Sequence, residues 1–402
     1  MNASSDMPTH RTSGSRASSV VMLLENNPYP EDVRVRREAE SLARSGYRVT
    51  VVAPRGAGQP WRESVRGVGV VRFPLPQGES GAGLVVEYLV ANLVMHALGA
   101  VAVLRGAAVL HLHNPPDTLF PLALLARAAG RRVVFDQHDL FPELTSVKTG
   151  SRAAVAAARA CERLSCRAAH VVICANESHA ELVRGRAAAP AAAVAVVRNG
   201  PPRALLRAGP SGRPGSIADP HLVYVGAMSS QDGAERLPHI LRALVEEHGL
   251  EGARLTLVGD GPARDAVERE ARAAGVSDRV SVTGWVPLDD VPRFLADADL
   301  CVDPAPATEL NERSTMIKVA EYLAAGRAVV AYRLRETART AGDAAVLVPG
   351  GDEGAFASAL ADLARDERRR RSLEERARAR AEQLVWERSE EVLLRAYAAL
   401  TG

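Results

Sequence analysis

The sequence predicts an α/β protein of two doubly wound domains, each a parallel sheet with helices on both faces. Short apolar runs alternate with segments of helical periodicity, which is typical of parallel sheets that are covered on both sides. The alternation stops once, between Gly200 and Ala218, where Pro, Gly, Ser and Arg predominate. A length of 402 residues and an apolar fraction of 47% suit two domains with sizeable cores.

The first domain is expected over residues 20–203. We expect residues 1–19 to be a disordered leader and not a signal peptide, because they lack an apolar core. The predicted strands are Val20–Leu24, Val49–Ala53, Val109–His113, Val133–Asp136, Val171–Ala175 and Val194–Val197. Helical periodicity predicts helices over Asp32–Ala43 and Pro121–Ala129.

Leu84–Leu104 is an apolar stretch about as long as a membrane span. It contains Glu87, Asn92 and His96, whose side chains are costly to place in lipid. We therefore expect an amphipathic helix that packs on the protein or lies at a membrane interface, in preference to a transmembrane helix. Peripheral association with a membrane stays open.

A second alternating series predicts a second domain over residues 219–385, after a linker at 204–218. Its strands are predicted at Leu222–Gly226, Leu255–Val258, Val280–Thr283, Leu300–Asp303 and Ala328–Ala331. A helix rich in Arg and Glu follows Asp366, and we expect it to present a solvated face. Trp386 begins a last helix that continues through Leu400.

Composition and motifs argue against several classes of function. The net charge of +2 and the aromatic fraction of 4% give no basis for binding nucleic acid. The absence of a G-x-G-x-x-G or phosphate-loop motif disfavours a dinucleotide dehydrogenase or a simple nucleotidase. We expect no metal, no Ser-His-Asp triad and no nucleophilic cysteine. The cysteines lack C-x-x-C spacing and suit a reduced cytoplasm: Cys161, Cys166, Cys174 and Cys301.

The segment Asn311–Gly326 has an unusual helix start. We expect a loop and then a helix that begins at Ser314 and Thr315. Arg313 and Lys318 place cations at the positive end of its dipole, where carboxylates are normally favoured. Free N–H groups, two hydroxyls and two cations describe a phosphate site, and a solvated helix start with chance charges is the alternative. The residues expected on its buried face are Ile317, Ala320, Leu323 and Ala324.

Polar loops follow the predicted strands at their carboxyl ends, where ligands bind in doubly wound folds. In the first domain they are Asn26–Arg34, His111–Asp117 and Asp136–Glu143. Helix capping explains any single loop of this kind, but three at neighbouring strand ends favour a site. In the second domain they are Gly226–Gly233 and Gly259–Pro262, whose glycines would let a ligand approach the backbone, and Gly284–Pro287, an apolar face for a nucleobase.

With these residues in place, the chain resembles the retaining, nucleotide-sugar-dependent glycosyltransferases of family 4. These enzymes have the GT-B fold, in which two Rossmann-like domains face each other across a cleft. The resemblance covers essentially the whole chain from Val20. The segments that carry it are Asp32–Ala39, Gly46–Val52, His111–Asp117, Phe135–Glu143 and Arg198–Gly200. Most specific is an R-S-T-M-x-K-V-x-E-Y signature at Arg313–Tyr322, together with Ser230–Gly233.

The resemblance implies a donor site with two departures from the family pattern. Glu321 matches the second carboxylate of the E-x7-E motif, which binds the donor ribose, but Arg313 stands at the first. The Arg and Lys that bind the diphosphate fall at Ala227 and Asp232, so we expect Lys318 and Arg313 to replace them. The expected donor residues are Gly226, Ser229, Gln231, Asp232, Gly259, Gly261, Val286, Arg313, Ser314, Thr315, Met316, Lys318 and Glu321.

His138 matches a family histidine that contacts the donor sugar near the reacting centre, and we group it with Arg313 and Lys318 as catalytic. The expected acceptor residues are Asn27, Asp32, Arg34, His113, Asn114, Asp117 and Asp139. The resemblance implies no protein nucleophile and no cofactor, so the protein orients the substrates and stabilises charge. Residues 386–402 resemble a terminal helix that crosses back to the first domain.

We therefore expect a retaining, metal-independent glycosyltransferase that uses a UDP-sugar in preference to a GDP-sugar. Its acceptor would be a small-molecule natural product or a lipid-linked saccharide, in the cytoplasm or at the inner membrane face. Two alternatives on the same fold stay open. One is a nucleotide-sugar 2-epimerase, which needs no acceptor, and the other is a non-catalytic sugar-nucleotide binding protein.

Overall fold

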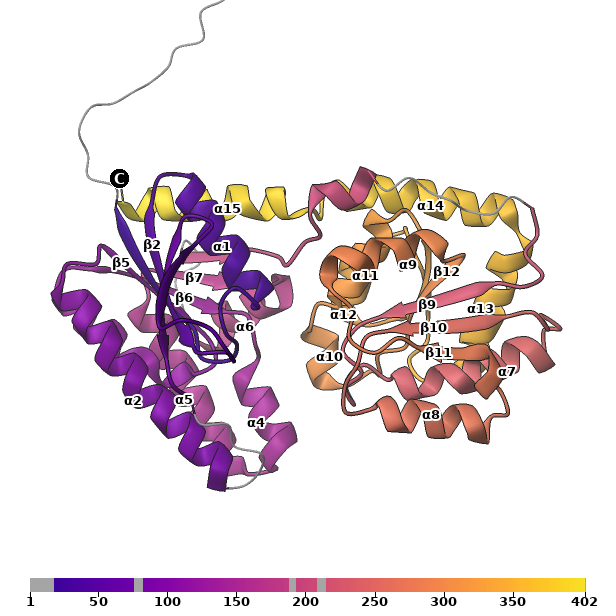
Figure 1. Ribbon diagram of the computed structural model, residues 1–402, viewed down its shortest axis with the longest axis horizontal. Coiled ribbons are helices and arrows are strands. Elements are labelled where there is room, and N and C mark those ends of the chain that lie inside the picture. The colour runs from indigo at the N-terminus through magenta and orange to yellow at the C-terminus, as the bar shows by residue number, and fades with distance from the viewer. Residues whose placement is uncertain (1–17, 76–81, 188–192, 208–214, 402) are drawn as a thin grey trace, which may run out of the picture. The chain divides into compact units, whose positions relative to one another are not determined.

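The structure is a computed structural model that describes residues 18–75, 82–187, 193–207 and 215–401. It contains an eight-stranded sheet in the order β3-β4-β2-β1-β5-β6-β7-β8 and a six-stranded sheet in the order β11-β10-β9-β12-β13-β14 (Figure 1). The described strand pairs are parallel apart from β3 and β4, which are antiparallel. The predicted α/β class with two parallel-sheet domains is confirmed.

The first sheet contains all six predicted strands, and two more. Its strands are β1 Ser19–Leu23, β2 Arg48–Pro54, β3 Arg62–Val65, β4 Val68–Phe73, β5 Val109–His113, β6 Arg132–Gln137, β7 Val171–Cys174 and β8 Val194–Val196. The helices along this part of the chain are α1 Val33–Arg44, α2 Ala82–Leu104, α3 Phe120–Ala128, α4 Phe141–Thr149, α5 Arg152–Ala168 and α6 Glu177–Arg186. Strand β3 escapes prediction because it is a short, mostly exposed edge strand without an apolar run.

The second sheet contains the five predicted strands and β14. Its strands are β9 His221–Val225, β10 Arg254–Val258, β11 Val280–Val282, β12 Leu300–Asp303, β13 Ala328–Tyr332 and β14 Val346–Val348. Its helices are α7 Leu237–Glu246, α8 Arg264–Ala273, α9 Val291–Asp297, α10 Glu309–Arg313, α11 Ile317–Ala324, α12 Arg335–Ala341, α13 Glu353–Arg365 and α14 Glu367–Ala381. The last helix is α15, Trp386–Thr401.

The chain divides into two compact units. The first consists of Met1–Asp136, Ala168–His170 and Tyr397–Gly402, and the second of Gln137–Arg167 and Val171–Ala396. Most of the predicted leader and part of the predicted linker lie outside the described residues. The predicted domain boundaries stay predictions.

Each face of the six-stranded sheet carries its own apolar core. Successive side chains of a strand point to opposite faces, so β9 contributes Leu222 and Tyr224 to one cluster and Val223 and Val225 to the other. This double coverage explains why the strands read as continuous apolar runs in the sequence.

Helix α14 has the solvated face that its charges predict, with Arg368, Arg371 and Arg376 exposed, but its other face is buried. Arg370, Leu373 and Ala377 are buried. The Arg370 guanidinium donates to the carbonyl oxygens of Leu363 at 2.7 Å and Ala364 at 3.2 Å, at the end of α13. A cation at a helix C-terminus satisfies carbonyls that have no partner within the helix and complements its dipole. The arginine is therefore buried as a cap.

Helix α2 is apolar on its exposed side as well as its buried side, so the prediction of an amphipathic helix is wrong. Ala91 and Met95 are buried, whereas Leu89 is 62% exposed, Leu93 73% and Leu104 79%. The window Val86–Leu104 is long and apolar enough to cross a membrane, and 22% of it is buried. The exposed apolar face of α2 thus has no described partner within the chain.

Candidate active site

A cavity of about 180 Å³ lies in the second unit, where loops that follow four strands meet the turn between α10 and α11. We call it the strand-end cavity. The residues that line it are His138, Asp139, Leu140, Leu144, Ala175, Asn176, His179, Asn199, Gln231, Leu310, Ser314, Thr315 and Ile317. It thereby brings together five predicted site residues: His138, Asp139, Gln231, Ser314 and Thr315.

Asn176 joins the start of α6 to the opposite wall of the cavity. As the N-cap of α6, its Oδ1 accepts from the backbone N–H of His179 at 2.8 Å. Its amide nitrogen donates to the carbonyl oxygen of Arg313 at 2.8 Å and to the Thr315 hydroxyl at 3.0 Å. The α10–α11 turn is therefore held against α6 by one side chain.

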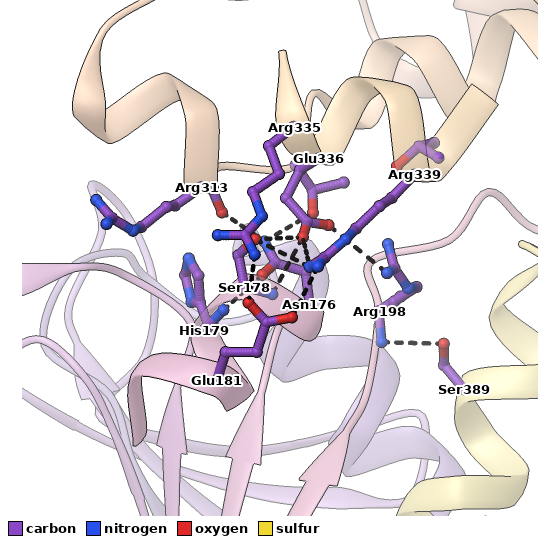
Figure 2. A network of polar contacts seen from close by, with 12 residues as sticks. Asn176, Ser178, His179, Glu181, Arg198, Arg313, Arg335, Glu336, Arg339 and Ser389 are labelled. Carbon is purple, nitrogen blue, oxygen red and sulfur yellow. Dashed lines mark hydrogen bonds and ion pairs between the residues drawn. The ribbon is translucent and has the colours of Figure 1, made fainter. Parts of the chain in front are cut away.

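Glu336 of α12 holds the same helix start from another side (Figure 2). Its carboxylate is buried and accepts from the backbone N–H of Ser178 at 3.0 Å and from the Ser178 hydroxyl at 2.6 Å. Arg339 donates to Glu336 at 2.9 Å. Nearer the surface, Glu181 pairs with Arg335 and Arg339. These contacts fix the first turn of α6, and with it the cavity wall.

Lys318 does not offer the free cation that the sequence predicts for a phosphate. Its ammonium donates to Asp232 Oδ1 at 2.5 Å and lies 3.7 Å from Asp303 Oδ1. Burial lowers the pKa of Lys318, but Asp303, Tyr224 and Asp232 together raise it above its ordinary value. Burial raises the pKa of Asp303, and Lys318 opposes this. The lysine charge is thus neutralised within a buried cluster.

Loss of Lys318 is expected to leave the carboxylates of Asp232 and Asp303 without a compensating cation. We expect Lys318→Met to lower the free energy of unfolding by about 3 kcal/mol, because it removes one partner of a buried ion pair. Without the ammonium the pKa of Asp303 rises further, so the carboxyl is protonated in acid and the loss grows as the pH rises from about 5 to about 8. Urea denaturation of the wild type and of Lys318→Met at about pH 5 and about pH 8 measures the two free energies of unfolding.

Lys148 provides the matched control, since it is the other lysine of the chain and is exposed. Lys148→Met is expected to change the free energy of unfolding by less than about 0.5 kcal/mol at either pH. A loss at Lys318 that does not depend on pH would contradict the role given to Asp303.

The helix start at Asn311–Gly326 also differs from its prediction. Arg313 belongs to the short helix α10 and pairs with Glu309 at 2.8 Å. Helix α11 begins only at Ile317, whose side chain is 39% exposed and lines the cavity instead of facing the core. Lys318 takes the buried position. Within the turn, the Ser314 hydroxyl donates to the carbonyl oxygen of Leu310 at 2.9 Å, whereas the Thr315 hydroxyl accepts from Asn176 and keeps its own hydrogen.

The glycines of the second domain are needed for packing, and the predicted approach of a ligand to them stays a prediction. A Cβ on Gly259 would lie 2.1 Å from the carbonyl oxygen of Gly226, and a Cβ on Gly261 would lie 2.7 Å from that of Met228. A Cβ on Gly226 would lie 2.9 Å from Lys318 Cε. The glycines therefore let the loops after β9 and β10 pack directly on one another.

The other predicted donor residues lie near these loops. The Ser229 hydroxyl donates to Asp232 Oδ2 at 2.5 Å and orders the turn that presents Gln231 to the cavity. Val286, Met316 and Glu321 are half-buried and, of the described residues, are not among those that line the cavity.

Most of the predicted acceptor residues lie in the first unit, in a buried polar network. Arg34 donates to both carboxylate oxygens of Asp136 at 2.7 Å, and His113 Nδ1 lies 3.0 Å from the same carboxylate. The Asn114 amide donates to Asp117 at 3.0 Å. Arg34, His113, Asn114 and Asp117 are buried, Asp32 caps α1, and Asn27 is exposed. Asp139 is the predicted acceptor residue that lines the strand-end cavity.

This network also has the composition of a metal site, which the sequence does not predict. Glu38, His111, His113 and Asp136 place their ligand atoms within 4.8 Å of one another, and all four are buried. The guanidinium of Arg34, however, contacts both carboxylates, Asp136 at 2.7 Å and Glu38 at 3.2 Å. A cation already compensates them, so we treat the network as structural.

Asn176, His179 and Asn199 line the cavity but are absent from the predicted site. Asn176 and His179 follow β7, and Asn199 follows β8. The rule that places ligands beyond the carboxyl ends of strands applies to these loops too. Extending it from the first three loops to all of them would have found these residues.

Two family models match the chain. Glycosyl transferase 4-like domain matches residues 32–200, and Glycosyl transferases group 1 matches residues 219–366. A 2-deoxystreptamine N-acetyl-D-glucosaminyltransferase of Streptomyces fradiae is 30% identical over 164 residues, 40% of this chain and 36% of that protein. The lipopolysaccharide core biosynthesis glycosyltransferase LpsE of Rhizobium meliloti (strain 1021) is 33% identical over 153 residues, 38% of this chain and 42% of that protein. The matches thus span less than half of these relatives.

Among solved structures, Anabaena Alr3699/HepE in complex with UDP covers 95% of this chain and 100% of its own, with a TM-score of 0.68 and 17% identity. At that identity the likeness shows the fold, which is GT-B.

Proposed function

Because a glycosyltransferase family model matches each of the two parts of the chain, we propose that the protein transfers a sugar from a nucleotide diphosphate sugar to an acceptor. The transfer proceeds with retention and without a metal. The observation that carries the proposal is the strand-end cavity, which places His138 and Asp139 beside Gln231 and Thr315. Groups that position a sugar and groups that bind its leaving diphosphate thus share one space.

The donor is a UDP-sugar in preference to a GDP-sugar. A protein of the same fold is described in complex with UDP, which supports this choice. The α10–α11 turn supplies the Thr315 hydroxyl, which accepts from Asn176 and keeps its own hydrogen, and the backbone N–H groups of Thr315 and Met316; such donors bind anions. These groups take over the diphosphate, because Lys318 and Arg313 are already paired with carboxylates.

His138 and Asp139 orient the sugar at the reacting carbon. No side chain is assigned as a nucleophile, and the leaving diphosphate accepts the proton of the acceptor hydroxyl on the same face of the sugar. The contribution of the protein is then positioning and stabilisation of developing charge, which are large terms when they are preorganised.

A panel of UDP- and GDP-sugars, with and without acceptor, tests the proposal. Nucleotide release that requires an acceptor such as 2-deoxystreptamine supports transfer. Formation of an epimer without acceptor would identify an epimerase. Binding that raises the melting temperature without any turnover would identify a binding protein. If neither UDP nor GDP raised the melting temperature, the transferase, the epimerase and the binding protein would all be contradicted.

The names of two relatives support two classes of acceptor. One relative is named for 2-deoxystreptamine and the other for lipopolysaccharide core biosynthesis. A small-molecule natural product and a lipid-linked saccharide are therefore both proposed, for an enzyme in the cytoplasm or at the inner face of the membrane.

For a lipid-linked saccharide acceptor, we propose that α2 docks on an anionic lipid surface. Its exposed apolar residues recur every three or four positions and form one stripe: Val86, Leu89, Leu93, Ala97, Val101 and Leu104. Basic residues cluster where α2 and α3 end: Arg105, Arg127, Arg131 and Arg132. An apolar stripe beside cations suits a bilayer interface with anionic headgroups.

Leu93→Glu is expected to weaken binding to phosphatidylglycerol-containing vesicles by at least about tenfold, because it places a charge in the stripe. Co-sedimentation measures this. Leu93 is 73% exposed and Val147 of α4 is 68% exposed, so Val147→Glu is a matched control that should bind vesicles as the wild type does. A dimer that Leu93→Glu dissociates would instead identify a second copy as the occupant of this face.

A further inference from the structure

His179 is a buried imidazole in the wall of the strand-end cavity. The residue is 3% exposed and lines the cavity. Among the described residues, its Nε2 has no hydrogen-bond partner. Buried polar atoms nearly always have a partner, and leaving one without a partner is costly. An atom of this kind at a ligand cavity points to a group that the ligand supplies.

The second ring nitrogen determines what Nε2 can do. His179 Nδ1 lies 3.4 Å from the carbonyl oxygen of Gln137. Because a carbonyl only accepts, Nδ1 carries the hydrogen, and in a neutral imidazole Nε2 then carries the lone pair. Burial lowers the pKa of His179 to about 4, with the Gln137 carbonyl acting in the opposite direction. The ring is therefore neutral near pH 7 and Nε2 is an acceptor.

The imidazole is also held in place. The backbone N–H of His179 donates to Asn176 Oδ1 at 2.8 Å, and the preceding residue, Ser178, donates twice to the buried Glu336. Figure 2 shows His179 and Asn176 together at the start of α6, with Arg313 beside them. Preorganisation of this kind lets one hydrogen bond discriminate between ligands.

We propose that His179 is a specificity-determining residue whose Nε2 accepts a hydrogen bond from one hydroxyl of the transferred sugar. The inference rests on the proposed function. A cavity of about 180 Å³ is smaller than the roughly 300–1,000 Å³ of pockets that enclose whole drug-sized ligands, so it suits one sugar ring. His138 lines the same cavity and would contact the ring from another wall.

The test compares the UDP-sugar of highest turnover with its monodeoxy analogues. In the wild type, one analogue should lose at least about tenfold in kcat/KM, because its missing hydroxyl leaves the buried acceptor unpaired. In His179→Leu that discrimination should vanish, while His179→Gln, which keeps an acceptor, should retain part of it. Between about pH 6 and pH 9 the pH profile of His179→Leu should match that of the wild type, since a neutral acceptor does not titrate there.

Three outcomes separate this inference from the proposed function. If the wild type turns over the UDP-sugar and His179→Leu still discriminates against the same monodeoxy analogue, the inference is overturned and the proposed function stands. A pH profile that loses its basic or acidic limb in His179→Leu would replace it with a proton-transfer role. No turnover of any UDP- or GDP-sugar by the wild type would overturn the proposed function. Stabilisation by UDP should be equal in the wild type and in His179→Leu, because the proposed contact is to the sugar.

A measurement on the wild type covers the case in which His179→Leu does not fold. With 15N-labelled histidine, the Nε2 resonance of His179 should move when the UDP-sugar is added and stay in place when UDP alone is added. Equal shifts with both ligands would contradict a contact to the sugar. His179→Gln serves to assign the resonance.

Discussion

Replacing His138 by Ala is expected to lower kcat/KM for sugar transfer by about 10²–10³-fold. His138 follows β6 directly and lines the strand-end cavity beside Asp139. In the proposed mechanism, which relies on positioning and charge stabilisation, His138 contacts the sugar at the reacting carbon, and loss of one such polar group has an effect of this size. Initial rates of nucleotide release in the presence of acceptor measure it.

His239→Ala provides the control. His239 lies on α7, where its Nε2 is 3.1 Å from Glu270 and its side chain is 32% exposed. Its removal is expected to change kcat/KM by less than about twofold. An active His138→Ala variant would remove His138 from the reacting centre, and equal losses in both variants would indicate damage to the fold.

Gly259→Ala is expected to lower the free energy of unfolding by about 3 kcal/mol or more, which combines backbone strain with overpacking. The residue has φ +139°, and a Cβ would lie 2.1 Å from the backbone oxygen of Gly226. Because a backbone atom cannot rotate away as a side chain can, the loops after β9 and β10 must separate. Urea denaturation measures the loss.

Gly275→Ala separates the contribution of backbone strain from that of overpacking. Gly275 has φ +70°, and no atom lies within 4 Å of the position that a Cβ would take, so only the strain of a left-handed residue remains, about 1–2 kcal/mol. A loss at Gly259 no larger than that at Gly275 would show that the loops are not packed as tightly as the structure indicates.

Local patterns account for what the sequence predicts well. Val109–His113 and Leu300–Asp303 are strands with the predicted bounds, because each is a short apolar run covered on both faces. Helix α1, Val33–Arg44, lies within one residue of its predicted bounds at both ends, because its apolar residues recur at helical spacing. Strand-end loops supplied His138, Asp139 and Gln231 of the cavity lining for the same reason: the rule depends only on where a strand stops.

Long-range pairing accounts for what the sequence misses. Lys318 and Asp232 are 86 positions apart, and nothing near either residue indicates that they neutralise each other. A lysine at a helix start is therefore mistaken for a free cation. Ile317 and Lys318 exchange their expected roles because the buried ion pair with Asp232 holds Lys318 inside, whereas Ile317, the first residue of α11, lines the cavity.

The strand-end cavity draws its walls from two distant parts of the chain. Its lining residues between His138 and Asn199 fall in the region of the first family match, and those between Gln231 and Ile317 in the region of the second. Neither half-protein carries a complete pocket. A chimera that joins one half to the other half of a homologue would therefore inherit mismatched walls, and engineering of its selectivity has to vary both halves together.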